Sequence, residues 1–243
     1  MEWQDRAIIL MVRSHGESSA IVEVLTPQYG RHAGLVRGAT GKRLRGILQP
    51  GNVVDVHWRA RLSEHLGTFS FEAVEARAPA LFDNALALGG LASASAMASL
   101  TLPEREAQPH IFEAFDVLIA QMPNVEIWPA LYVRWEAGVL RELGYGLQLD
   151  RCAATGSAEN LTHVSPRSGQ AVCAEAAKPY LDKLLILPGF LRREPAPLNS
   201  GDVLAGLTLT GYFLERRVLW PVDKVLPEAR KRMIERLEHG GHG

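Results

Sequence analysis

The chain has 243 residues, 47% of them hydrophobic and 22% charged, with a formal net charge of −1, which excludes a largely disordered chain and allows a sizeable core. No apolar run approaches the ~20 residues that span a membrane, and Glu2 and Asp5 stand where a signal peptide would be basic. Two cysteines, Cys152 and Cys173, are too few for a disulfide framework, so we expect a cytoplasmic protein that does not contact a membrane.

Residues 1–78 predict a five-stranded barrel. Five short segments with strand-like alternation are separated by turns at Tyr29-Gly30, at Pro50-Gly51 and before Gly67. This pattern fits an OB fold, and it leaves an SH3-like barrel open. Trp58 shares one face of its strand with valines at 54 and 56, which predicts a core position, with base stacking as the alternative.

Positive charge is concentrated in the middle of this predicted barrel. Residues 27–61 carry seven cations and one acid, so this segment has a charge of +6 and the rest of the chain −7. Residues 37–45 predict a flexible cationic loop between the third and fourth strands, suited to a phosphate backbone; a solvated basic loop is the alternative. The Gly and Ser/Thr of a nucleotide-binding P-loop are absent. The predicted DNA contacts are Arg31, Arg37, Lys42, Arg43, Arg45, Arg59 and Arg61.

Residues 79–243 predict a helical domain, interrupted by a turn-rich insertion at residues 150–178. Helices are expected within residues 81–100, 109–122, 128–146, 198–220 and 227–237, with Ser200 or Asp202 near the start of the fourth. Arg134 lies on the third, a largely apolar helix, where an arginine needs an anionic partner. That partner is either an internal carboxylate such as Glu136 or an anion supplied by another molecule.

Four blocks of sequence resemble the bacterial recombination mediator family RecO, in the same order along nearly the whole chain. They are EVLTPQYGRHAGLVRGA, LQPG, RWEAGVLRELGYGLQLDRCAATG, and SPRSG before Cys173. The resemblance implies an α+β fold, with an N-terminal OB barrel followed by a helical bundle. It also implies a nucleoid-associated protein of DNA repair that binds single- and double-stranded DNA and anneals complementary strands. Such a protein works with RecR to help RecA load onto DNA coated with single-stranded-DNA-binding protein (SSB).

The resemblance further implies docking of the acidic C-terminal tail of SSB, for which Arg134 and Trp135 are the predicted contacts. It implies no catalytic residue and no cofactor, and no hydrolase, calcium-loop or dinucleotide motif is present in the sequence. An OB-fold RNA-binding or ribosome-associated factor is the alternative function. A scaffold that contacts only acidic proteins is a third.

The chain departs from the family in the insertion. Metal-binding members have a Cys-x-x-Cys pair at each end of it. In this chain each pair keeps only its first cysteine: Cys152 is followed by Thr155, and Cys173 by Ala176. His163 could supply a third ligand, with a solvated turn histidine as the alternative. We therefore expect no structural zinc and an insertion held by local packing.

Overall fold

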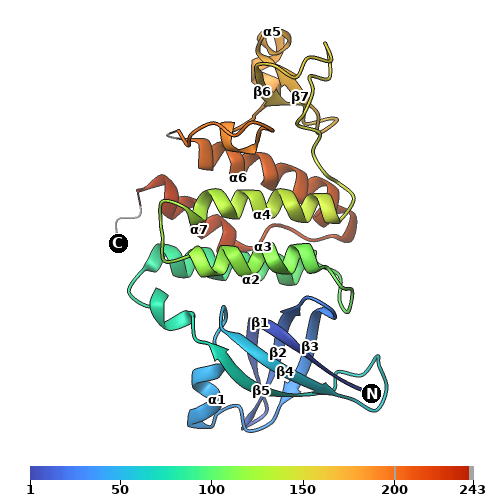
Figure 1. Cartoon of the computed structure of the whole chain (residues 1–243), viewed down its shortest axis with the longest axis vertical. Coiled ribbons are helices and arrows are strands. Elements are labelled where there is room, and N and C mark those ends of the chain that lie inside the picture. Colours follow the sequence, from blue (N-terminus) through green and yellow to red (C-terminus); the bar gives the residue numbers. More distant parts are fainter. Residues whose placement is uncertain (200, 241–243) are drawn as a thin grey trace. The chain divides into compact units, whose positions relative to one another are not determined.

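The computed structural model describes residues 1–199 and 201–240, which form two compact units (Figure 1). Unit 1 comprises residues 1–125 and 227–233. Unit 2 comprises residues 126–226 and continues from residue 234. The division of the chain into an OB domain ending at residue 78 and a helical domain stays a prediction.

Unit 1 contains a closed five-stranded barrel in the order β1-β2-β3-β5-β4. β3 and β5 pair in parallel, and the other neighbours are antiparallel. This order, with a helix between β3 and β4, is that of an OB fold, so the predicted OB barrel is confirmed over its SH3-like alternative. The strands are β1 Glu2–His15, β2 Ser19–Thr26, β3 Gly30–Val36, β4 Val53–Arg59 and β5 Thr68–Glu75.

The core of the barrel is formed by the inward-facing side chains of the strands, which alternate with outward-facing ones. Inward-facing residues of β2 and β4, including Val22, Val24 and Val56, are buried together. Trp58 is 2% exposed, and its Nε1 donates to the carbonyl oxygen of Leu66 at 3.0 Å. The core position predicted for Trp58 is therefore confirmed, and its alternative role in stacking bases is wrong.

Besides the barrel, unit 1 contains the helices α2 (Ala85–Thr101) and α3 (Pro109–Gln121) and the start of α7 (Glu228–Glu238). α2 begins after Asn84, whose side chain accepts a hydrogen bond from the N–H of Ala87 at 2.9 Å, as an N-cap does. α3 begins with a proline, which needs no N–H partner in the first turn. α7 starts in unit 1 and ends in unit 2. α3 lies within the segment predicted for it, and α2 and α7 each extend one residue beyond theirs, to Thr101 and Glu238.

Unit 2 is built on two packed helices, α4 (Trp128–Glu142) and α6 (Asp202–Phe213). α4 ends before Gly144, whose φ of +84° is the left-handed conformation that terminates many helices. α6 continues as a π-helix over Leu214–Leu219 and a 3-10 turn over Trp220–Val222. Asp202 lies in the first turn of α6, and its carboxylate accepts a hydrogen bond from the N–H of Asn199. Ser200, the other predicted cap, lies outside the described residues.

A small sheet that the sequence did not predict begins in the insertion and ends just after it. Its strands β6 (Leu161–Val164), β7 (Ala171–Cys173) and β8 (Leu185–Ile186) pair in the order β7-β6-β8. α5 (Ala174–Ala177) and a 3-10 helix (Lys178–Lys183) connect β7 to β8. Strands of two to four residues are too short to show a period of two, which explains why the insertion was predicted only as a turn-rich stretch. Over the described part of the chain, no helix is both long and apolar enough to cross a membrane.

Candidate nucleic-acid interface

The basic segment between β3 and β4 is a short helix and not the flexible loop that we expected. α1 spans Lys42–Ile47, and the Gly41 N–H donates to the carbonyl oxygen of Gly38 in the turn that precedes it. Leu44 and Ile47 pack against the barrel core. This packing fixes α1 on the barrel, so the charged side chains on its other faces are held in place and exposed. They are Lys42, Arg43 and Arg45.

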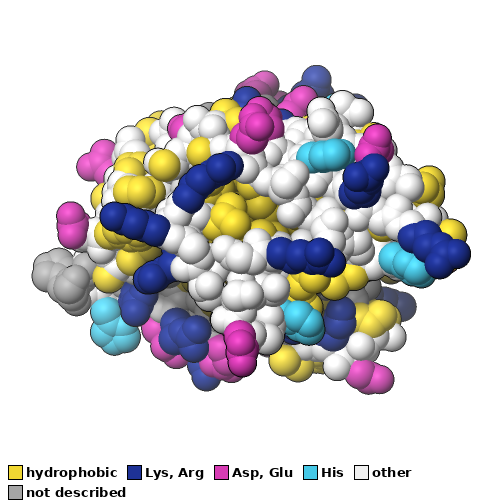
Figure 2. Space-filling model, turned by 90° about the horizontal axis from the view of Figure 1, so that it is seen from below, with side chains coloured by type: hydrophobic (Ala, Val, Ile, Leu, Met, Phe, Trp, Pro, Cys, Tyr) yellow, Lys and Arg dark blue, Asp and Glu magenta, His cyan; other side chains and the backbone are white. Residues whose placement is uncertain are grey.

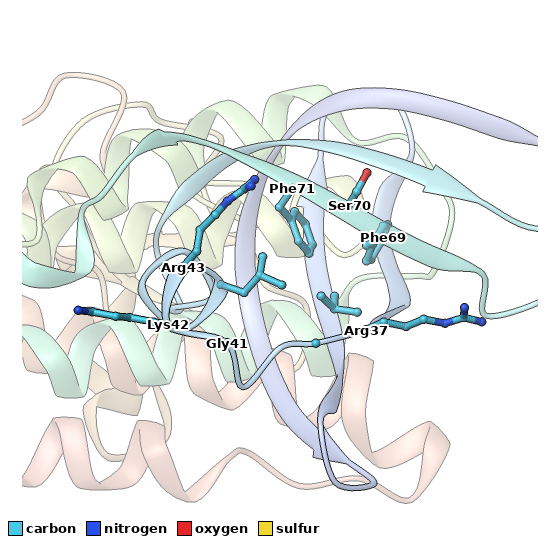
Figure 3. A pocket seen from close by; sticks show the side chains of 10 residues that line it. Arg37, Gly41, Lys42, Arg43, Phe69, Ser70 and Phe71 are labelled. Carbon is cyan, nitrogen blue, oxygen red and sulfur yellow. The ribbon is translucent and has the colours of Figure 1, made fainter.

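An open pocket of about 440 Å³ lies between this segment and β5 (Figure 3). The rings of Phe69 and Phe71, both buried, form its apolar floor. Arg43 lies beside Phe71, whereas Lys42 and Arg37 extend outward in opposite directions. The pocket therefore combines an apolar floor with a cationic rim, and such a rim attracts a phosphodiester chain.

The other predicted cations of the barrel are exposed as well. The side chain of Arg59 is 75% exposed, with its Nε 3.5 Å from Glu2 Oε2, and Arg61 follows at the start of the β4–β5 connection. Because exposed ion pairs are weak, Arg59 can exchange Glu2 for a phosphate at little cost. Figure 2 shows Lys and Arg side chains spread across this face of the molecule, while Asp and Glu gather mainly at its rim.

Arg31 differs from the other predicted DNA contacts, because its charge is used inside the protein. Its Nη1 lies 3.0 Å from Glu23 Oε2 and 3.3 Å from Glu104 Oε1, and its Nε donates to the carbonyl oxygen of Leu102. The side chain is only 14% exposed. Arg31 links the barrel to the segment after α2, and on this geometry it is left out of the contacts that we propose.

A buried aromatic cluster around His32 was missed by sequence reasoning. His32 is 4% exposed, and its ring centroid lies 4.9 Å from that of Trp58 and 5.1 Å from that of Trp3. Burial, reinforced by the charge of Arg105, lowers the pKa of His32 to about 4. His32 is therefore neutral near pH 7 and adds no positive charge to the interface. Inward-facing and outward-facing residues alternate along β3, and His32 has the same parity as the buried Gly30. This parity was the sequence signal that could have predicted the burial of His32.

The residues of the insertion do not fit a tetrahedral zinc site. Cys152 and Cys173 are both buried, and the N–H of Cys173 donates to Cys152 Sγ at 3.2 Å. Thr155, in the place of a third cysteine, has its Oγ1 3.7 Å from Cys173 Sγ. Burial raises the pKa of Cys152, but hydrogen bonds from Thr155 and from backbone N–H groups outweigh it and bring that pKa to about 6. His163 is not in a turn but on β6, where burial lowers its pKa.

No group of three or more His, Cys, Asp or Glu side chains within residues 1–199 and 201–240 is placed to hold a metal ion. Two thiols and a hydroxyl do not make the four-ligand set that structural zinc requires.

The predicted partner site on α4 is only partly accessible. Arg134 is exposed, and its Nη2 donates to the carbonyl oxygen of Phe190 at 2.8 Å. Glu136 is fully buried and accepts a hydrogen bond from Thr210, whereas the bond described for Arg134 is to the carbonyl oxygen of Phe190. Trp135 is 2% exposed, which leaves it almost no surface for another molecule, so it is not among the contacts that we propose.

Two family models match the chain on either side of the junction between barrel and helices. Recombination protein O N terminal matches residues 1–77, and Recombination protein O C terminal matches residues 83–225. The chain belongs to the RecO family. RecO relatives support this over the full length, including one from Caulobacter vibrioides that is 50% identical over 237 residues, covering 98% of each chain.

A relative from Phenylobacterium zucineum is 47% identical over 241 residues, covering 99% of each chain. One from Methylorubrum extorquens is 45% identical over 241 residues, covering 96% of this chain and 97% of its own. All three are named DNA repair protein RecO. Membership of the RecO family, recognised first in four sequence blocks, is thereby confirmed.

Proposed function

We propose that this RecO-family chain binds single- and double-stranded DNA through the exposed cations of its barrel and anneals complementary strands. The proposed contacts are Arg37, Lys42, Arg43, Arg45, Arg59 and Arg61. The observation that carries the proposal is the fixed α1 helix, which presents three exposed cations beside a pocket with a cationic rim. We further propose that the chain acts with RecR to help RecA load onto SSB-coated DNA in the nucleoid, as the resemblance to the family implies.

Annealing suits this kind of surface. Two strands repel each other through their phosphates, and cations that bind both backbones reduce this repulsion. Contacts to phosphate carry no sequence information and leave the base edges free to pair. Strand pairing forms no covalent bond, so the proposed activity requires no catalytic residue and no cofactor.

The first test removes the charge of α1. Lys42, Arg43 and Arg45 are replaced together by Ala, and affinities for single- and double-stranded DNA are measured between 50 and 300 mM salt. Because three phosphate contacts are lost, both affinities should fall by about 10- to 100-fold, and the slope of log affinity against log salt should flatten by about 2 to 3. The annealing rate of SSB-coated complementary strands should fall with them.

A matched control removes the same charge elsewhere. Arg167, Lys178 and Lys183 are exposed residues of unit 2, and their triple replacement by Ala should leave the slope unchanged. A folded α1 variant with unaltered affinity and slope would contradict the proposed interface. Tighter binding to single-stranded RNA than to DNA, without annealing, would favour an RNA-binding factor.

We also propose that Arg134 receives a carboxylate of the SSB C-terminal tail. Its guanidinium is exposed, and among the described residues it bonds to a carbonyl oxygen and to no carboxylate, so it can still accept an anionic partner. Arg134→Ala should abolish binding of a tail peptide while the melting temperature and DNA affinity stay unchanged. Arg141→Ala, an exposed arginine of the same helix, is the control. A large fall in melting temperature with Arg134→Ala would instead make its bond to Phe190 structural.

A further inference from the structure

Two aromatic rings hold an arginine between them at the end of the long helix in unit 2. Arg216 Cζ lies 4.7 Å from the ring centroid of Tyr212 and 4.9 Å from that of Trp220. The three residues are spaced by four along α6, the π-helix and the following 3-10 turn, so they form a continuous stack on one side of the chain. Both contacts are within the distance at which a cation is attracted to an aromatic face.

The outer end of this stack is open to solvent. Trp220 is 50% exposed, whereas Trp58, Trp128 and Trp135 are buried. The backbone around Trp220 is fixed, because the N–H of Asp223 donates to the Trp220 carbonyl oxygen at 3.1 Å and that of Lys224 to the Leu219 carbonyl oxygen at 3.0 Å. The indole of Trp220 is therefore a large apolar surface that is held in a defined position. Such a surface is usually buried, but here half of it is exposed to solvent.

The charge in the stack also remains available. Arg216 is exposed, and within the described chain no carboxylate forms an ion pair with it. Its neighbour Arg217 differs: it is half-buried, lies over the buried ring of Phe213, and packs against the backbone at Gly169. Arg217 thus contributes to the packing of unit 2. The guanidinium of Arg216, in contrast, has N–H groups at its edge that can donate hydrogen bonds to an anion.

We propose that Trp220 stacks on an unpaired base of single-stranded DNA and that Arg216 binds the adjoining phosphate. The stack of tyrosine, guanidinium and indole would be extended by a planar base, since every base offers a π-face and every nucleotide a phosphate. An exposed flat ring fits a base better than a peptide, which is recognised in a groove or at a sheet edge. The inference rests on the proposed function and adds a contact in unit 2 that selects unpaired strands.

Fluorescence separates this site from the rest of the protein. Only Trp220 and the partly exposed Trp3, of the five tryptophans, can be quenched by direct stacking. Oligo(dT) should therefore quench the emission of the Trp3→Phe protein and leave that of the Trp3→Phe/Trp220→Phe double variant nearly unchanged. Equal quenching in the two variants would overturn the inference. So would quenching by an acidic peptide and not by oligo(dT).

Affinity measurements supply the second test. Trp220→Ala should weaken binding to single-stranded DNA by about 5- to 100-fold. Affinity for blunt duplex should change less than about twofold, because paired bases are already stacked on one another. Arg216→Gln should weaken single-strand binding and flatten its salt dependence by about 0.7. The matched control is Tyr180→Ala, which removes a 55% exposed aromatic ring of the same unit.

The two proposals fail in different ways. If wild-type protein binds neither form of DNA, the proposed function fails. If Trp220→Ala keeps its melting temperature and binds single strands as tightly as wild type, only the inference about Trp220 fails. An equal loss for single strands and duplex would also overturn it, because a stacking contact selects unpaired bases.

Discussion

His32 is an ionisable side chain enclosed by aromatic rings inside the barrel. Trp3, Trp58 and Phe69 surround it, and the nearest charge that affects it is the cation of Arg105. Protonation would therefore place a positive charge in a poorly solvated site beside another positive charge. The folded protein avoids this charge down to a pH of about 4, whereas the unfolded chain takes up a proton at the ordinary histidine pKa of about 6.5.

The stability of the fold should therefore depend on pH through His32. Because the folded-state pKa is lowered, the contribution of His32 is complete above pH 6.5 and is lost progressively as the pH falls toward 4. By pH 4.5 the wild-type free energy of unfolding should have fallen about 2 to 3 kcal/mol further, relative to pH 7, than that of His32→Phe. Urea unfolding at the two pH values measures this difference. An NMR titration with a midpoint near 6.5 in the folded protein would contradict it.

Arg31 shows what a count of charges along the sequence leaves out. Its partner Glu23 lies eight residues away, and Glu104 lies 73 residues away. A local charge count sees seven cations, but it does not see a pairing that only the tertiary fold creates. Glu23, an acid within the apolar strand β2, was the one local signal that a cation had to be placed beside it.

At the scale of elements, long periodic segments were predictable and short ones were not. The five barrel strands and the main helices follow from apolar spacing that persists over many residues. α1 has only six residues, with two glycines and several arginines around it, so its composition resembles that of a loop. α1 forms because Leu44 and Ile47 pack against the barrel core. This is a tertiary contact, and intrinsic helix propensity cannot predict it.

β8, just after the predicted insertion, is a second element too short to be predicted from the sequence. It consists of Leu185 and Ile186, and it exists because β6 pairs with it at His163 and Val164. The sheet extends to Ile186, beyond residue 178, where the insertion was predicted to end, and the bounds of the insertion stay a prediction. A two-residue strand is defined by its partner, and single-sequence periodicity cannot identify it.

At the scale of the molecule, the sequence predicted the fold family better than the site. Four ordered blocks spread over the chain identify RecO, and the strand order of the barrel agrees. The predicted site rested on residue type alone, whereas the contacts that we propose also depend on exposure: Arg31 and Trp135 are left out of them, and Arg216 and Trp220 are included. Burial and pairing are set by contacts between distant segments, so they become visible only in the folded chain.

The folding of the whole chain should also be independent of metal, unlike that of a domain built on structural zinc. Cys152, Thr155 and Cys173 contact one another directly, so the insertion is closed by hydrogen bonds to sulfur where a metal would otherwise link the same positions. Elemental analysis of tag-free protein should find well under one zinc per chain, and a chelator should leave the melting temperature unchanged. One zinc per chain, together with a melting temperature lowered by the chelator, would mean that His163 or another side chain completes a site. Replacing both cysteines by Ser provides the control, because it should alter local stability without changing the response to the chelator.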